Sequence, residues 1–139
     1  MRKWIVMIIC LFLVACSNSK YTADTPEEAL DLIHSNGDFA KVADILNFIQ
    51  ISEKQTFYVF KGEMDNQTEW YVANIEKDEE SKWFVKEAIN IGLPSGESEI
   101  HGTNTFTAGI GTNTEEVKDS WKIVDITDDD FVWIELEEN

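Results

Sequence analysis

One short segment gathers the side-chain types that hydrolytic chemistry uses. Ser95, Ser98 and His101 lie within seven positions of the chain, with Glu97 and Glu99 between them. A serine hydroxyl can attack a carbonyl carbon when an imidazole takes its proton and a carboxylate orients the imidazole. Side chains so near in sequence rarely reach that geometry, and no Gly-x-Ser-x-Gly turn occurs. A solvated loop is therefore expected, and a small hydrolase that uses His101 is the alternative.

Acidic residues crowd the C-terminal end of the chain. Asp125, Asp128, Asp129 and Asp130 lie within six positions, and Ca²⁺ favours several carboxylate oxygens on a flexible loop. The order differs from the Asp-x-Asp-x-Asp-Gly pattern of an EF-hand, and these acids coincide with an expected hairpin turn. We therefore expect a solvated acidic turn and no metal site, with these four residues as weak candidates for cation binding.

The charge balance excludes several classes of function. The chain has 27 Asp and Glu residues against 11 Lys and Arg residues, for a formal net charge of −16. Such a surface repels the phosphate backbone, so no nucleic-acid partner is expected. Arg2 is the only arginine, and no Gly-rich phosphate loop occurs. Phosphate recognition normally uses one or both of these features, so we expect no nucleotide and no cofactor.

A thiol follows a short apolar run near the N-terminus. Arg2 and Lys3 precede residues 4–15, which carry no charge and are largely apolar. As a helix that run would measure about 18 Å, well short of the ~30 Å hydrocarbon core of a bilayer. The pattern predicts a secretory signal segment and not a permanent membrane span.

The residues around that thiol identify the kind of signal. Leu13-Val14-Ala15-Cys16 resembles the lipobox of bacterial membrane lipoproteins. The resemblance implies cleavage after Ala15, a diacylglycerol joined to Cys16 by a thioether, and a location on the extracytoplasmic face of a cell membrane. A plain signal peptide is the alternative, but its cleavage would favour a small residue in place of Leu13. Cleavage would also remove Cys10, so no internal disulfide is expected.

The rest of the chain divides into a tether and one domain. Residues 16–24 are polar after the cysteine and predict a tether, and residues 25–139 predict a single extracytoplasmic domain. The domain begins with a predicted helix over 26–35, capped by Thr25 and stopped at Asn36-Gly37. Residues 39–51 suit either a helix or a buried strand. We expect a second short helix to about Leu46 and then a short strand.

Strand patterns dominate from residue 55 onward. Segments rich in β-branched and aromatic residues predict an antiparallel meander over 56–61, 70–75 and 82–89. A strand over 106–110 and a hairpin over 121–126 and 131–136 follow. The fold class is therefore α+β, with one or two short N-terminal helices packed on an antiparallel sheet of about five or six strands. Both faces of these strands are apolar, so each face needs a cover: helices on one, and loops, a second sheet or a partner on the other.

The domain shares short segments with one group of proteins. Its Thr-Pro-Glu-Glu-Ala-Leu start and its Lys-Trp-Phe-Val segment are similar to those of small uncharacterised lipoproteins of Bacillus-type bacteria. That similarity implies no site residues. Four tryptophans in the domain could form a carbohydrate or peptide platform, but residues of this size flanked by β-branched neighbours are more often core.

These observations predict a membrane-anchored lipoprotein with a non-catalytic binding or interaction role. Its expected partners are the lipid bilayer, through acylated Cys16, and an envelope protein or a small ligand. Two alternatives remain open at this point: a small cell-envelope hydrolase, and an acidic module that senses a cation or another ligand.

Overall fold

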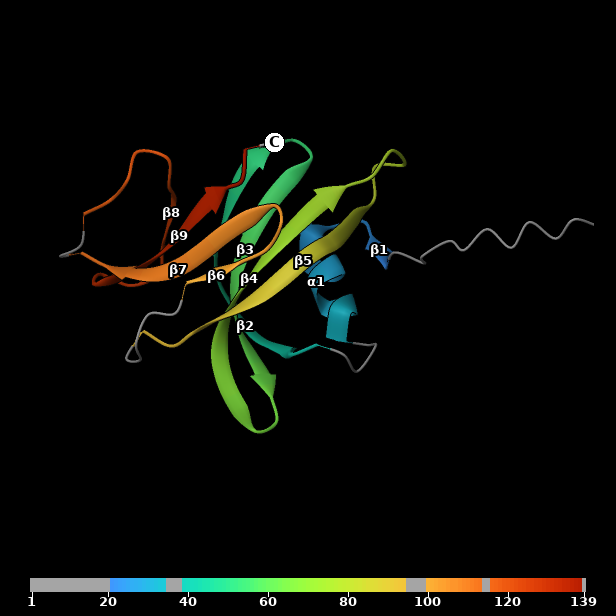
Figure 1. Ribbon diagram of the computed structural model, residues 1–139. Coiled ribbons are helices and arrows are strands. Elements are labelled where there is room, and N and C mark those ends of the chain that lie inside the picture. The colour runs from blue at the N-terminus through green and yellow to red at the C-terminus, as the bar shows by residue number, and fades with distance from the viewer. Residues whose placement is uncertain (1–20, 35–38, 95–99, 114–115, 139) are drawn as a thin grey trace, which may run out of the picture.

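The described chain forms two antiparallel sheets and one helix. The computed structural model describes residues 21–34, 39–94, 100–113 and 116–138 (Figure 1). Sheet A has the strand order β1 (Thr22–Ala23), β5 (Trp83–Gly92), β4 (Gln67–Lys77), β3 (Gln55–Met64), β2 (Lys41–Ser52). Sheet B has the order β6 (His101–Gly102), β7 (Phe106–Thr112), β9 (Asp130–Leu136), β8 (Lys122–Asp125). The helix is α1 (Pro26–His34), and the α+β class predicted from the sequence is confirmed.

The predicted meander is the centre of sheet A. Strands β3, β4 and β5 pair in sequence order, as expected, and each runs longer than predicted. The turn between β3 and β4 contains only Asp65 and Asn66, whose φ angles are 52° and 62°. Two successive residues with positive φ make the tight turn that matches the twist of a hairpin, and Asp and Asn tolerate this conformation. The strands therefore continue to Met64 and resume at Gln67.

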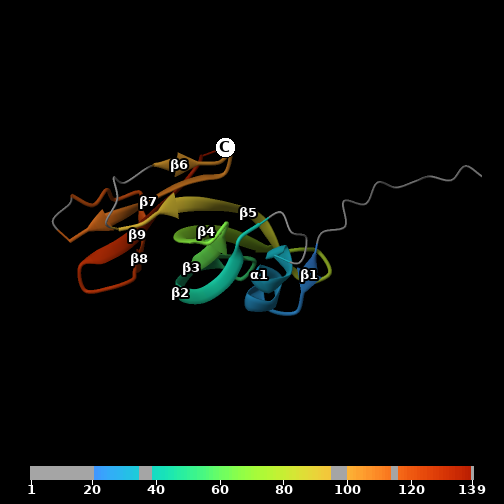
Figure 2. The same cartoon turned by 90° about the horizontal axis from the view of Figure 1, so that it is seen from below.

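Sheet A is covered on both faces. On one face its side chains pack against sheet B, and on the other they pack against α1 (Figure 2). The sheet–sheet core includes an edge-to-face contact between Phe57 and Phe106, whose ring centroids lie 5.0 Å apart. The helix-side core includes Leu30, which is fully buried. The sequence left loops, a second sheet or a partner as possible covers for the face away from the helix, and the structure shows a second sheet there.

Helix α1 begins where its sequence predicts. The Thr25 hydroxyl accepts a hydrogen bond of 3.2 Å from the backbone N–H of Glu28, and the Thr25 carbonyl accepts one from Ala29. Glu27 and Glu28 lie in the first turn, where negative charge is favourable. The predicted stop at Asn36-Gly37 lies outside the described residues.

The predicted second helix is wrong, because residues 41–52 form one long edge strand, β2. The spacing of Val42, Ile45, Leu46 and Ile49 suggested a helix. In the strand, Val42, Ile45 and Phe48 lie opposite Gly62, Phe60 and Tyr58 of β3, and the pairing register shifts between these positions. Each shift inserts an extra residue, so side chains three apart share the helix-facing side of the sheet.

The C-terminal strands are confirmed and form sheet B. Strand β7 contains the predicted strand over 106–110 and continues to Thr112, and β8 and β9 form the predicted hairpin. The segment that ends at His101 was expected to be a solvated loop, and its last residue begins the two-residue strand β6, which pairs with β7. Sheets A and B meet at their edges as well as their faces: the Asn47 side-chain N–H of β2 donates a 2.7 Å hydrogen bond to the Asp125 carbonyl of β8.

Helix α1 has nine residues. Within the part of the chain that the structure describes, no helix is both long and apolar enough to cross a membrane.

Candidate functional site

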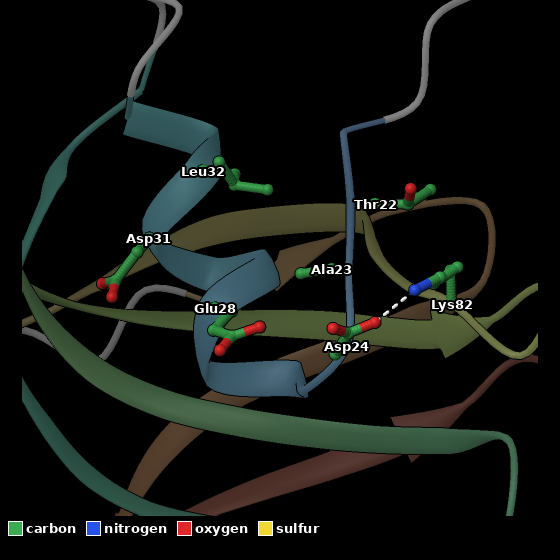
Figure 3. Close-up of a pocket in the computed structure, with 7 residues that line it drawn as sticks. All are labelled: Thr22, Ala23, Asp24, Glu28, Asp31, Leu32 and Lys82. Atoms are coloured by element: carbon green, nitrogen blue, oxygen red, sulfur yellow. Dashed lines mark hydrogen bonds and ion pairs between the residues drawn. The ribbon is translucent and has the colours of Figure 1, made fainter.

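A pocket of about 500 Å³ opens between β1 and α1 (Figure 3). Strand β1 has only two residues, and its pairing with Phe84 and Trp83 of β5 holds it beside the helix. Apolar and acidic side chains share the lining. The lining residues are Thr22, Ala23, Asp24, Glu28, Asp31, Leu32 and Lys82.

Negative charge dominates this pocket. Lys82 forms a hydrogen-bonded ion pair with Asp24, and both residues line the pocket (Figure 3). That hydrogen bond, together with the negative charge of Asp24, raises the pKa of the Lys82 ammonium. The lining thus carries three carboxylates, those of Asp24, Glu28 and Asp31, and one ammonium. The pocket attracts cations, but the Asp24 and Lys82 side chains are 75% and 45% exposed, so water and salt screen the attraction.

A second feature lies on the helix side of sheet A, at its β2 edge. The Tyr58 hydroxyl donates a 2.5 Å hydrogen bond to Oε1 of Glu27 on α1. Phe48 of β2 stacks on the Tyr58 ring, with centroids 5.0 Å apart and planes 12° apart. Tyr58 is 3% exposed, whereas Phe48 is 51% exposed. We call these three residues the Phe48 cluster.

The electrostatics of the Phe48 cluster follow from this geometry. Burial raises the pKa of the Tyr58 hydroxyl, and the hydrogen bond to Glu27 and its negative charge raise it further. Tyr58 therefore stays protonated as a donor to the Glu27 carboxylate. A carboxylate offers about four acceptor sites, so Glu27 retains capacity for further donors. An exposed aromatic ring and a carboxylate thus both contact the buried Tyr58.

The acidic turn predicted between β8 and β9 forms as expected. The Thr127 hydroxyl accepts hydrogen bonds from the N–H groups of Asp129 and Asp130. The Asn113 side chain donates to the Asp128 carbonyl, and the Asn113 N–H donates to the Asp129 carbonyl at 3.0 Å. Backbone groups of these aspartates therefore hold the turn closed.

No metal centre is assembled among the residues that the structure describes. No three of their His, Cys, Asp and Glu side chains come together in a group that could hold an ion. Asp125, Asp128, Asp129 and Asp130 belong to this set. Asp125 uses its backbone carbonyl to join β8 to β2, as described above.

Only part of the hydrolase alternative falls within the residues that the structure describes. Ser95 and Ser98 lie outside the described residues, and His101 begins β6 opposite Ala108. The other histidine, His34, lies in the last turn of α1, with its Nδ1 atom 3.1 Å from the Phe39 carbonyl oxygen. This contact ties the end of the helix to the residue two positions before β2.

The tryptophans of the domain form no exposed platform. Trp70, Trp83 and Trp133 are each less than 9% exposed. Trp121 stacks on Trp133, with ring centroids 4.5 Å apart and planes 12° apart, and the Lys118 ammonium lies 5.4 Å from the Trp121 ring centroid. The Trp121 ring is thus engaged by Trp133 and Lys118, and the three other rings are buried, in agreement with the core role expected from the sequence.

The Phe48 cluster was not predicted from the sequence. Glu27 and Tyr58 stand 31 positions apart, and Phe48 joins them only because β2 is a bulged strand and not the predicted helix. The lipobox residues, Ala15 and Cys16 included, lie outside the described residues.

Comparison with known proteins adds no assignment to these sites. No protein-family model, no curated protein and no solved structure matches this chain.

Proposed function

We propose that this chain is a bacterial lipoprotein, held on the extracytoplasmic face of a cell membrane by acylated Cys16, whose domain acts by binding and not by catalysis. One observation carries the proposal: Leu13-Val14-Ala15-Cys16 directly ends an apolar run preceded by Arg2 and Lys3. Basic start, short apolar run and cysteine occur in the order and at the spacing that lipoprotein processing uses.

The charge of the chain supports a lipid anchor over an electrostatic one. Cleavage after Ala15 removes Arg2 and Lys3 from the 11 basic residues, so nine face 27 acidic residues and the formal net charge becomes −18. Anionic headgroups repel such a protein. Two acyl chains, at ~0.8 kcal/mol for each buried methylene, are enough for stable attachment, whereas one chain gives only reversible binding.

The place where the chain enters the fold supports a domain close to the bilayer. Thr22 is the first residue of sheet A and lies six positions after Cys16. Six residues span at most about 20 Å when fully extended. The β1 edge of the domain and its acidic pocket would thus lie near the headgroups, and the acyl chains would hold them there against repulsion.

A binding role is supported by what the surface offers. The Phe48 cluster exposes an aromatic ring beside a carboxylate, and the pocket at β1 offers carboxylates around a partly apolar lining. Both are recognition surfaces, and neither contains a nucleophile paired with a base. Binding is therefore the function that these sites serve best.

The experiment is metabolic labelling with radioactive palmitate, followed by membrane fractionation. The unchanged chain should carry label and sediment with membranes, and Cys16→Ala should lose the label. The matched control is Cys10→Ala, which changes a cysteine within the apolar run and should keep both label and location. Label retained in Cys16→Ala, or lost in Cys10→Ala alone, would contradict the proposal.

A further inference from the structure

We infer that the Phe48 cluster binds a basic side chain from an extended, arginine- or lysine-containing segment of a partner protein. This inference rests on the proposed binding role of the domain, for which it names the binding site and the chemistry of the ligand. The cluster consists of Phe48, Tyr58 and Glu27, contributed by β2, β3 and α1.

The exposed ring of Phe48 is held in a fixed position. Its inner face stacks on Tyr58, and its backbone N–H donates a 2.9 Å hydrogen bond to Oδ1 of Asn47. Tyr58 is itself held, because it is buried in the sheet and bonded to Glu27. A ring held in place loses little conformational freedom when a ligand covers it, which favours binding.

The chemistry of the cluster suits a cation on an apolar stem. Lysine and arginine bury their methylene stems on apolar surface while their charged ends stay in water. A cationic group is attracted to the face of an aromatic ring. Glu27 lies at the hydroxyl end of the Tyr58 ring on which Phe48 stacks, so a stem that covers Phe48 and points toward that end brings its charge to the carboxylate. Arginine adds a planar fork that matches carboxylate geometry.

Charge favours a basic partner over a second copy of this chain or a lipid surface. The formal net charge of −16 repels another copy and anionic headgroups alike. A stable dimer also needs about 800 Å² from each partner. Among the described residues, the exposed large apolar side chains that β2 and β3 place on this face are Phe48, at 51%, Met64, at 39%, and Ile45, at 36%, and three side chains supply only a small part of that area.

The edge of β2 does not suit the addition of a regular strand. Its pairing with β3 shifts register at three places, and bulges of this kind blunt an edge strand. Asn47 uses its side chain to occupy the N–H of Phe48 and to reach Asp125 of β8. Recognition at this edge therefore depends on side chains, and the partner segment lies across the ring and not along the strand.

The test measures binding of a short fluorescent peptide of alternating arginine and serine to the full chain in detergent, by fluorescence anisotropy at two salt concentrations. Phe48→Leu keeps an apolar side chain over Tyr58 but removes the ring. Glu27→Gln keeps an acceptor for Tyr58 but removes the charge. Each should weaken binding about two- to fivefold, as expected for an exposed cation–aromatic contact or ion pair.

Matched controls distinguish binding at the Phe48 cluster from a general attraction of the peptide to the negatively charged surface. Glu79→Gln removes the same charge from the exposed turn between β4 and β5, and Ile100→Ala shortens an apolar side chain that is 69% exposed. Neither should change affinity. Equal losses in Glu27→Gln and Glu79→Gln, no loss in Phe48→Leu, or no binding to the unchanged chain would each overturn the inference. Thermal melts verify that each variant is folded, and palmitate labelling of Cys16 tests the anchor independently of peptide binding.

Discussion

Two glycines of β7 lie directly beneath aromatic rings of β9, and one of them gives the sharpest test of packing in sheet B. Gly109 lies opposite Trp133, and Gly111 opposite Phe131. A Cβ atom on Gly109 would lie 2.7 Å from Cζ2 of Trp133, which is closer than two non-bonded carbon atoms can approach. Trp121 stacks on Trp133 at 4.5 Å, so the indole ring cannot move away without breaking that stack. We expect Gly109→Ala to destabilise the domain.

The size of this effect follows from a comparison with Gly102 of β6. A Cβ atom on Gly102 would lie 3.2 Å from Oγ1 of Thr107, and a small rotation of that side chain relieves the contact. At either position, replacing glycine by alanine restricts the unfolded chain and so stabilises the folded domain by about 0.4–1 kcal/mol. The difference between the two variants therefore isolates overpacking, which costs about 1–3 kcal/mol.

The assay is urea unfolding followed by far-ultraviolet circular dichroism, because tryptophan fluorescence would itself change with the position of Trp133. The unfolding free energy of Gly109→Ala should lie about 1–3 kcal/mol below that of Gly102→Ala. A difference below about 0.5 kcal/mol, the scatter of ordinary surface substitutions, would refute the close contact between Gly109 and Trp133.

Two further predictions concern the contacts that hold α1. Tyr58→Phe removes the hydrogen bond to Glu27 and should lower the unfolding free energy by about 1 kcal/mol. This value is near the low end for hydrogen bonds to charged groups, because Glu27 is exposed. Because folding raises the pKa of Tyr58 above its ordinary value of 10.0, its contribution is complete below pH 10 and is lost as the pH rises further. Urea titrations between pH 8 and 11 should show a larger loss in the unchanged chain than in Tyr58→Phe, where the loss from Tyr71, whose pKa burial also raises, remains; identical profiles would count against it. Thr25→Ala removes the helix cap and should cost about 1 kcal/mol, whereas Thr25→Ser should cost much less; equal melting temperatures for the two variants would contradict the capping role.

Local signals in the sequence predicted the elements whose contacts are local. The capped helix after Thr25, the meander of β3 to β5 and the hairpin of β8 and β9 join segments that are neighbours in the chain, and each is confirmed. Periodic apolar residues and turn residues are sufficient for such elements.

The elements that were missed depend on pairing and packing that residue spacing along the chain does not show. The bulges of β2 give Val42, Ile45 and Phe48 a helical spacing, and only pairing with β3 shows that these three share one face. The division into two sheets depends on packing of Phe57 against Phe106 and on the bridge from Asn47 to Asp125. The Phe48 cluster combines both kinds of contact, and no local pattern marks it.

The two proposals assign different edges of sheet A to different tasks. Strand β1, where the tether enters, is one edge of the sheet, and β2, which carries Phe48, is the other. Neighbouring strands lie about 4.8 Å apart, so four strand spacings separate these edges by about 19 Å. If acylated Cys16 holds β1 near the bilayer, the far edge carries the aromatic ring away from the headgroups. A basic segment could then reach Phe48 without first passing through the layer of anionic lipid that would compete for it.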